Sequence, residues 1–176
     1  MSNAVIEAIK SRRSCRAFKS DAVPKELIEE VIEAGLWAAS GMGKQAGAIL
    51  AVTNPQMREK LRKVNAQIGG WGEDFDPFYG APVVLIALAR KDCMTAVYDG
   101  SLVMGNLMLA AHSLGLGSIW IHRAKEEFEM PEFQELLAQL GAEGEYIGIG
   151  HCALGYIDKL PEQVAPRKDG RVFWVE

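Results

Sequence analysis

One long segment without charge constrains the fold of this chain more than any other feature. Between Ser101 and His112 the sequence reads SLVMGNLMLAAH and contains no Lys, Arg, Asp or Glu. Asp99 opens the apolar segment and Gly115 follows it, which predicts a helix that stops at this glycine. A helix that is apolar on most sides is either central in its own domain or buried against a partner. In a chain of 176 residues, burial against a partner is the more attractive interpretation.

Helical and strand patterns alternate around this segment. Hydrophobic spacing and capping residues predict further helices from Asn3 or Ser2 to about residues 11–13, from Pro24 to Leu36, from Pro55 through Val64, and from Pro131 to Gly141. Apolar runs predict strands over residues 48–52, 83–89, 118–121 and 146–156, with a last short strand over 172–175. This order predicts one α+β domain over residues 1–176, with a mixed central sheet flanked by helices.

Composition limits the class of protein. The chain is 49% hydrophobic and 24% charged, which is typical of a soluble globular protein, and its net charge of −4 argues against nucleic acid as a partner. Because there is no signal-peptide pattern and no apolar run long enough to cross a bilayer, we expect a cytoplasmic protein without a membrane partner. An odd cysteine count argues against a disulfide framework, and the histidine spacings predict no metal site. The residues concerned are Cys15, Cys93, Cys152, His112, His122 and His151.

Basic residues crowd both ends of this acidic chain. Arg12, Arg13 and Arg16 surround Ser14 near the start, and Arg167, Lys168 and Arg171 lie near the end. Guanidinium groups can donate paired hydrogen bonds to phosphate oxygens, so both clusters are consistent with one anionic ligand held between the chain ends. Alternatively, the first cluster follows a helix end simply because cations complement the helix dipole there.

Glycine-rich segments do not match the usual nucleotide motifs. The turn from Ser40 to Gln45 resembles a phosphate loop, but Ala38 replaces the first glycine and Gln45 replaces the magnesium-binding hydroxyl. It is therefore either a flexible polar turn or a turn whose backbone approaches a ligand. Residues 148–153 satisfy GxGxxA, but they continue as a strand, where glycines allow another element to pack closely.

Polar residues at the end of the predicted strand 118–121 are a further candidate site. His122 has no evident partner in sequence, so a structural or backbone role is favoured over that of a base. No Ser-His-Asp or Cys-His pattern fits a known nucleophile arrangement, so no catalytic side chain is named.

Taken in order, five motifs resemble the nitroreductase family over essentially the whole chain. They are Arg12-Arg13-Ser14-Cys15-Arg16-Ala17-Phe18, the turn Ala39 to Gln45, the helix Asp99 to Ala111, the segment Leu114 to Ile121, and Gly155-Tyr156 followed by Pro166-Arg167-Lys168.

The resemblance implies an intertwined homodimer with two FMN sites at its interface. NADH or NADPH would donate hydride to FMN, and a small acceptor such as a nitroaromatic or quinone would take it in a ping-pong cycle. The FMN phosphate would lie among Arg12, Arg16, Arg167 and Lys168, with Arg13 and Ser14 near the ribityl chain and ring edge. Ser40, Gly41, Met42 and Gln45 would reach in from the other subunit. Ile121, His122 and Arg123 would offer backbone groups to the hydride-accepting nitrogen, and Asn65 would contact the pyrimidine edge.

The chain departs from the family pattern in the turn and in length. Ala39 and Gly43 stand where the family often has Pro and Asn, which leaves the ring contacts of that turn open. The chain lacks the longer insertions of larger members, so its aromatic segment either lines the substrate pocket or packs at the dimer seam; its members are Trp71, Phe75, Phe78 and Tyr79. Two alternatives stay open: a flavin-binding module without turnover, and a specialised enzyme such as a dehalogenase or a flavin-fragmenting enzyme.

Overall fold

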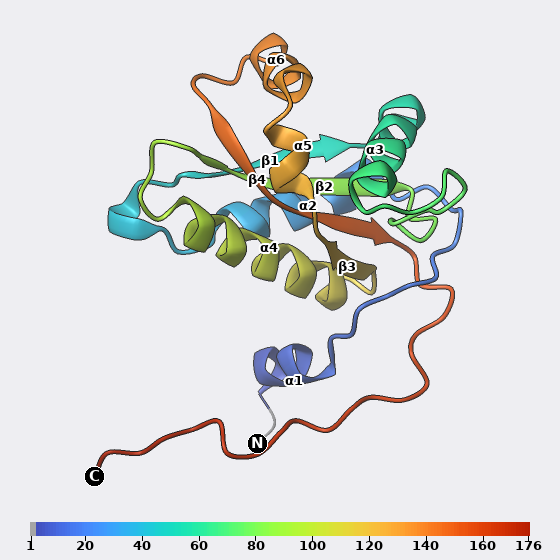
Figure 1. The fold of residues 1–176 in the computed structure, drawn as a ribbon. Coiled ribbons are helices and arrows are strands. Elements are labelled where there is room, and N and C mark those ends of the chain that lie inside the picture. Colours follow the sequence, from blue (N-terminus) through green and yellow to red (C-terminus); the bar gives the residue numbers. More distant parts are fainter. Residues whose placement is uncertain (1–2) are drawn as a thin grey trace.

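A four-stranded sheet forms the centre of the computed structural model, which describes residues 3–176 (Figure 1). The strand order is β1-β2-β4-β3, and all three ladders are antiparallel. The strands are β1 (Gly47–Val52), β2 (Val83–Arg90), β3 (Gly117–Ile121) and β4 (Tyr146–Gly155). Within the described chain, parallel pairing is limited to one bridge between Ser14 and Ser118. The sequence predicted a mixed sheet. The strands instead pair antiparallel, and the parallel bridge lies at the edge strand β3.

Helices cover both faces of the sheet. They are α1 (Ala4–Ser11), α2 (Lys25–Leu36), α3 (Pro55–Ile68), α4 (Ala96–Ser113), α5 (Ala124–Phe128) and α6 (Pro131–Gln139), with a 3-10 turn η1 (Gly41–Gly43) before β1. Alternate side chains of the buried strand β2 point to opposite faces. Val83, Leu85 and Ala87 pack with α2 and α4, whereas Val84, Ile86 and Leu88 pack with α3, α5 and α6. The predicted α+β arrangement of a sheet flanked by helices is confirmed.

Helix boundaries follow the predicted capping residues. Asn3 caps α1 by accepting hydrogen bonds from the amides of Val5 and Ile6, while Ser2 lies outside the described residues. Asn54 caps α3 in the same way, and Gly115 follows α4 with a left-handed φ of 76°. The long helix starts at Ala96, three residues before Asp99. No helix in residues 3–176 is both long enough and apolar enough to cross a membrane.

One predicted element was wrong and one was missed. Residues 172–175, predicted as a strand, are exposed chain without secondary structure, because no strand of residues 3–176 lies beside them to supply hydrogen bonds. The short helix α5 was not predicted, since five residues are too few to show a hydrophobic period.

Candidate functional site

The two ends of the chain meet beside β3 and β4. The amide of Cys15 donates to the carbonyl of Ser118 at 3.0 Å, and the amide of Lys19 donates to the carbonyl of Tyr156 at 2.9 Å. The amide of Asp158 donates back to the carbonyl of Ala17 at 3.0 Å. These bonds hold the segment after α1 against the start of β3 and the end of β4, next to the point where the C-terminal tail begins.

Arg12 lies where these two ends meet. Burial, together with the positive charges of Arg13 and Arg167, lowers the pKa of the Arg12 guanidinium. Its Nη1 atom is buried and has no hydrogen-bond partner within residues 3–176. A buried N–H donor without a partner is costly unless a ligand or water satisfies it. Arg12 is therefore a buried cation with one hydrogen-bond donor left for a ligand or water.

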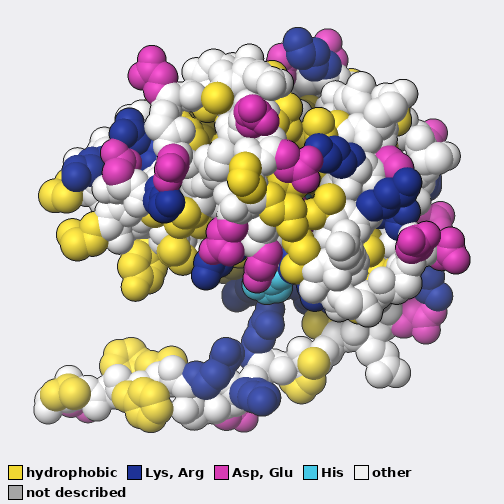
Figure 2. All heavy atoms as spheres, turned by 45° about the horizontal axis from the view of Figure 1, so that its top comes forward, with side chains coloured by type: hydrophobic (Ala, Val, Ile, Leu, Met, Phe, Trp, Pro, Cys, Tyr) yellow, Lys and Arg dark blue, Asp and Glu magenta, His cyan; other side chains and the backbone are white. Residues whose placement is uncertain are grey.

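The other basic residues differ in their roles. Arg13 donates from Nη1 to the carbonyls of Lys10 and Arg12, at 2.6 and 2.8 Å, which is the arrangement expected of a cation that complements a helix end. Arg16, Arg167 and Lys168 are exposed. Figure 2 shows Lys and Arg side chains both on the C-terminal tail and on the body of the molecule beside it.

At its far end, β3 stops in a strained turn. Arg123 has a left-handed backbone, with φ of 83°, which costs a non-glycine residue about 1–2 kcal/mol. Its guanidinium lies 4.2 Å from the centre of the Trp71 ring, within the range of a cation–π interaction. Ile121 is buried, and the His122 side chain is exposed. Non-glycine residues are held in such conformations mainly at functional sites.

Asn65 reaches this strand end from α3. It is fully buried, and its Nδ2 donates to the carbonyl of His122 at 2.9 Å and to Oε1 of Glu127 at 2.8 Å. Both neighbours of Nδ2 are oxygen acceptors, so the amide nitrogen of Asn65 must face them and its oxygen must point away. Its Oδ1 is buried without a partner in the described part of the chain. A ligand beside Oδ1 would have to donate a hydrogen bond.

Glu127 and His151 were missed by the sequence analysis. Both are fully buried, and His151 Nε2 lies 2.6 Å from Glu127 Oε2. Glu127 belongs to the unpredicted α5, and His151 was considered only as a metal ligand beside Cys152. The signal that could have found them is a histidine within an apolar strand, because a buried polar side chain requires a polar partner.

The turn from Ser40 to Gln45 is tied to the first turn of α4. Gly41 donates its amide to Asp99 Oδ1 at 3.0 Å, and the Gln45 amide donates to Ser40 Oγ at 2.9 Å. Met42 and Gln45 both have left-handed backbones, with φ of 54° and 49°. The side chain of Met42 is 78% exposed, so it is available to another molecule.

The turn and the Arg12 cluster lie at opposite ends of α4. Ser11, next to Arg12, contacts Nε2 of His112 through its Oγ at 2.8 Å, whereas the turn is bound to Asp99. Asp99 and His112 are thirteen positions apart on the helix, which corresponds to a rise of about 20 Å. Within one chain, the structure therefore does not bring the turn together with the basic cluster.

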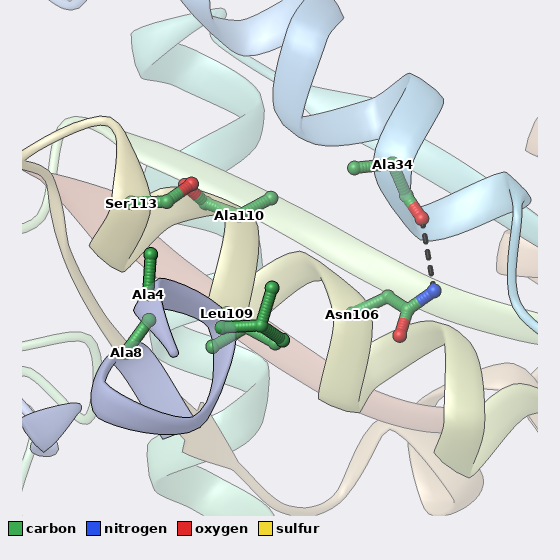
Figure 3. Close-up of a pocket in the computed structure, with 8 residues that line it drawn as sticks. Ala4, Ala8, Ala34, Asn106, Leu109, Ala110 and Ser113 are labelled. Carbon is green, nitrogen blue, oxygen red and sulfur yellow. Dashed lines mark hydrogen bonds between the residues drawn. The ribbon is translucent and has the colours of Figure 1, made fainter. Parts of the chain in front are cut away.

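An apolar groove lies between α1, α2 and α4 (Figure 3). Its volume is about 440 Å³, and Ala4 and Ala8 of α1 face Leu109 and Ser113 of α4 across it. Asn106 donates to the carbonyl of Ala34 at one side of the groove. Without a charged side chain in its lining, this groove does not suit an anion.

The predicted aromatic segment divides into two parts. Phe78 is fully buried and packs in the core, with its ring centre 5.3 Å from that of His151. Trp71 and Phe75 are 39% and 38% exposed, and their ring centres are 4.5 Å apart beside Arg123. Tyr79 is partly buried and packs against the same core as Phe78. The exposed pair is therefore the part of this segment that lies beside the end of β3.

Comparison with known proteins gives one family. Residues 9–69 and 71–156 match the model of the Nitroreductase family. A protein of Methanothermobacter thermautotrophicus, named as an NADH dehydrogenase/NAD(P)H nitroreductase, is 35% identical over 120 residues, which is 66% of this chain and 59% of that relative. The chain thus spans about three fifths of that relative's length.

Solved structures match over the full chain. A nitroreductase with bound FMN from Bacteroides fragilis is 29% identical, with a TM-score of 0.86 over 99% of this chain and 100% of the other. A nitroreductase with bound FMN from Desulfitobacterium hafniense is 27% identical, with a TM-score of 0.85 over 100% of both chains.

Proposed function

The chain belongs to the nitroreductase family, and we propose that it binds FMN between two copies of itself and passes hydride from NADH or NADPH to a small acceptor. Three buried side-chain polar atoms have no hydrogen-bond partner in residues 3–176: Trp120 Nε1 on β3 itself, the cationic donor Arg12 Nη1 and the acceptor Asn65 Oδ1. One observation carries the proposal: the last two belong to residues anchored near opposite ends of β3, because Arg12 precedes the segment that bonds to Ser118 through Cys15, and Asn65 bonds to the carbonyl of His122. From Ser118 to His122 the strand rises about 13 Å. An elongated ligand with an anionic tail and an N–H on its ring matches both atoms, and FMN has both features.

Each predicted site residue has a role under this proposal. Arg12, Arg16, Arg167 and Lys168 neutralise the phosphate, with Arg13 and Ser14 beside the ribityl chain. The backbone of Ile121, His122 and Arg123 faces the ring, and Asn65 Oδ1 accepts from its imide N–H. Bound FMN supplies the hydride chemistry, so the protein contributes position and charge. The Arg123 guanidinium favours negative charge on the ring, and no protein acid or base is required.

Two features support a homodimer with shared sites. The outer side of α4 is apolar and exposed, with Val97, Tyr98 and Leu102 each at least half accessible, and no residue of α1 is buried. Apolar surface of this extent is typical of an interface between subunits. The turn at Met42 is too far from Arg12 in its own chain, but it is exposed and can reach the partner's flavin.

The exposed pair Trp71 and Phe75 supports the proposed acceptor class. Beside the cation of Arg123, these rings favour flat, electron-poor acceptors such as nitroaromatics and quinones, which stack on aromatic faces. The loop that carries them is anchored to α3, because Arg62 donates to the carbonyls of Glu73 and Phe75.

Purified protein loaded with FMN tests the proposal directly. We expect a yellow protein with paired flavin bands, and NADH or NADPH oxidation that depends on added nitroaromatic or quinone. FMN binding without acceptor-dependent oxidation would instead indicate a binding module without turnover. Turnover with release of halide, or with breakdown of the flavin itself, would indicate a specialised enzyme on the same scaffold. Absence of FMN binding would overturn the proposal.

A further inference from the structure

Three polar side chains meet in the core beneath the end of β3. Asn65 comes from α3, Glu127 from α5 and His151 from β4, and all three are fully buried. Figure 1 shows the short helix α5 lying on the sheet, and the contact of Glu127 with His151 places the carboxyl group beside β4. The function proposed above assigns no role to Glu127 or His151.

Hydrogen bonds join this cluster to two backbone carbonyls at the end of β3. Glu127 accepts from Asn65 Nδ2 at 2.8 Å through Oε1 and contacts His151 Nε2 at 2.6 Å through Oε2. Asn65 Nδ2 also donates to the carbonyl of His122 at 2.9 Å, and His151 Nδ1 lies 3.3 Å from the carbonyl of Ile121. Both nitrogens of His151 face oxygen atoms, so the ring is held between the Glu127 carboxyl group and the carbonyl of Ile121.

Stability alone does not account for such a cluster. Polar side chains lose their hydration on burial, and replacing a fully buried pair of ionisable side chains with apolar ones of similar volume is often neutral or stabilising. The cluster does supply hydrogen-bonding contacts to the carbonyls of Ile121 and His122, which directly precede the strained residue Arg123. Arg123, directly after His122, keeps a left-handed backbone, which persists only when surrounding contacts determine it.

A second feature holds the same turn from the other side. A Cβ at Gly148 in β4 would overlap the carbonyl oxygen of Ala124, the first residue of α5. The glycine therefore lets α5 approach the sheet closely enough for Glu127 to reach His151. The close packing at Gly148 fixes the position of Ala124, and the polar cluster contacts the carbonyls of Ile121 and His122, so both restrict the backbone of residues 121–124.

We propose that Asn65, Glu127 and His151 are positioning residues, which hold the carbonyls of Ile121 and His122 and thereby the strained turn at Arg123 in the geometry needed for hydride transfer. This inference rests on the proposed function, since that turn faces the flavin ring. Misplacement of reacting groups by about 1 Å can reduce a rate about 100-fold.

Substitutions at Glu127 separate hydrogen bonding from charge. In Glu127→Gln, the new side chain can still accept from Asn65 and can donate to a neutral His151, whose Nδ1–H then donates to Ile121. In Glu127→Leu, both contacts are lost. Val31→Ala, a fully buried truncation on the opposite face of the sheet, controls for lost stability.

The test has two readouts. In the apo protein, amide hydrogen exchange at residues 121–124 should accelerate at least tenfold in Glu127→Leu and stay near wild type in Val31→Ala. In FMN-loaded protein, the single-turnover rate of flavin reduction at saturating NAD(P)H should fall at least tenfold in Glu127→Leu, and Glu127→Gln should recover most of that loss. If Glu127→Leu yields no folded protein, Asn65→Ala replaces it in the exchange measurement.

The outcomes distinguish this inference from the function on which it rests. If Glu127→Leu matches Val31→Ala in both exchange and reduction rate, the positioning role is wrong while the proposed function stands. If Glu127→Gln is as slow as Glu127→Leu, hydrogen bonding is not what matters and the inference is also overturned. If the wild-type protein binds no FMN, the proposed function fails, and the role in hydride transfer fails with it.

Discussion

At the scale of residues, the proposed function depends on which side-chain atoms have hydrogen-bond partners and which do not. Among the three arginines of the first basic cluster, Arg13 is satisfied by the end of α1 and Arg16 is exposed, whereas Arg12 keeps a buried donor without a partner in the described chain. The helix-end interpretation therefore describes Arg13, whereas the anionic-ligand interpretation stays a prediction for Arg12. The sequence pattern cannot separate them, because neighbouring arginines differ only in where their side chains point.

Arg12→Ala should weaken FMN binding about 10- to 100-fold. Hydrogen bonds to charged groups contribute about 1.5–3 kcal/mol, and 1.4 kcal/mol corresponds to a factor of ten in affinity. The melting temperature of the apo protein should not fall, because the substitution removes a buried cation that the protein alone does not satisfy. Titration of FMN fluorescence and thermal unfolding of apo protein measure the two effects. Lys25→Ala, which removes one exposed cation on α2, should leave FMN affinity unchanged, and equal affinity in Arg12→Ala would refute the phosphate assignment.

The buried thiol of Cys152 should make stability fall at alkaline pH. Burial raises the pKa of Cys152 to about 12, whereas an unfolded chain has a thiol pKa of about 8.5. The folded state therefore holds this proton more tightly. Its contribution to stability is complete below about pH 8.5 and declines by up to about 1.4 kcal/mol per pH unit as the pH rises toward 12. Urea unfolding between pH 7 and pH 10.5 should show a shallower decline for Cys152→Ala than for Cys93→Ala, and identical slopes would contradict this account.

At the scale of elements, the proposed site is formed by two short elements, the strand β3 and the helix α5. The edge strand β3 and the residue after it, His122, run along the proposed site, and the five-residue helix α5 follows the turn at Arg123. Gly148 is what allows α5 to lie so close to β4. The GxGxxA match in this strand thus reflects close packing, as expected from the sequence.

Gly148→Ala should destabilise the protein by about 1–3 kcal/mol, since an added methyl group must displace the backbone of Ala124. Because the displacement moves the end of β3, FMN affinity should fall as well. Gly72→Ala adds a methyl group with no atom within 4 Å and should change stability by less than about 0.5 kcal/mol. Urea unfolding of both variants measures the difference. A Gly148→Ala protein as stable as wild type would contradict the prediction, because it would show that the backbone of Ala124 can move without loss of stability.

At the scale of the whole molecule, one chain presents an incomplete site and an uncovered apolar face. The turn at Ser40–Gln45 and the basic cluster are separated by most of the length of α4, so under the proposed function two copies would be needed to bring them to one ligand. The exposed tail ends in Val172, Phe173, Trp174 and Val175, each more than two thirds accessible. These apolar side chains also lack a covering surface within the described part of their own chain, which agrees with an intertwined dimer.

Leu102→Glu should convert the dimer to monomers and abolish tight FMN binding together. The side chain is 50% exposed on α4, and a carboxylate buried there on association would have no partner. Leu140→Glu places the same charge at a 64% exposed leucine after α6 and should leave both properties unchanged. Sedimentation velocity and FMN titration measure the outcome, and a monomer that retains full FMN affinity would refute shared sites.

Local sequence patterns specify most of the elements of this protein and the residue types of its site. Hydrophobic period, caps such as Asn54, and glycines such as Gly115 act over a few residues, so they can be identified along the chain. Burial and packing, in contrast, determine which atoms are left without partners, and that Asn65, Glu127 and His151 meet beneath β3. Asn65 and Glu127 are 62 positions apart in the chain, yet their side chains are hydrogen-bonded. Contacts of that kind are set by packing of the sheet and its helices, and no short stretch of sequence contains them.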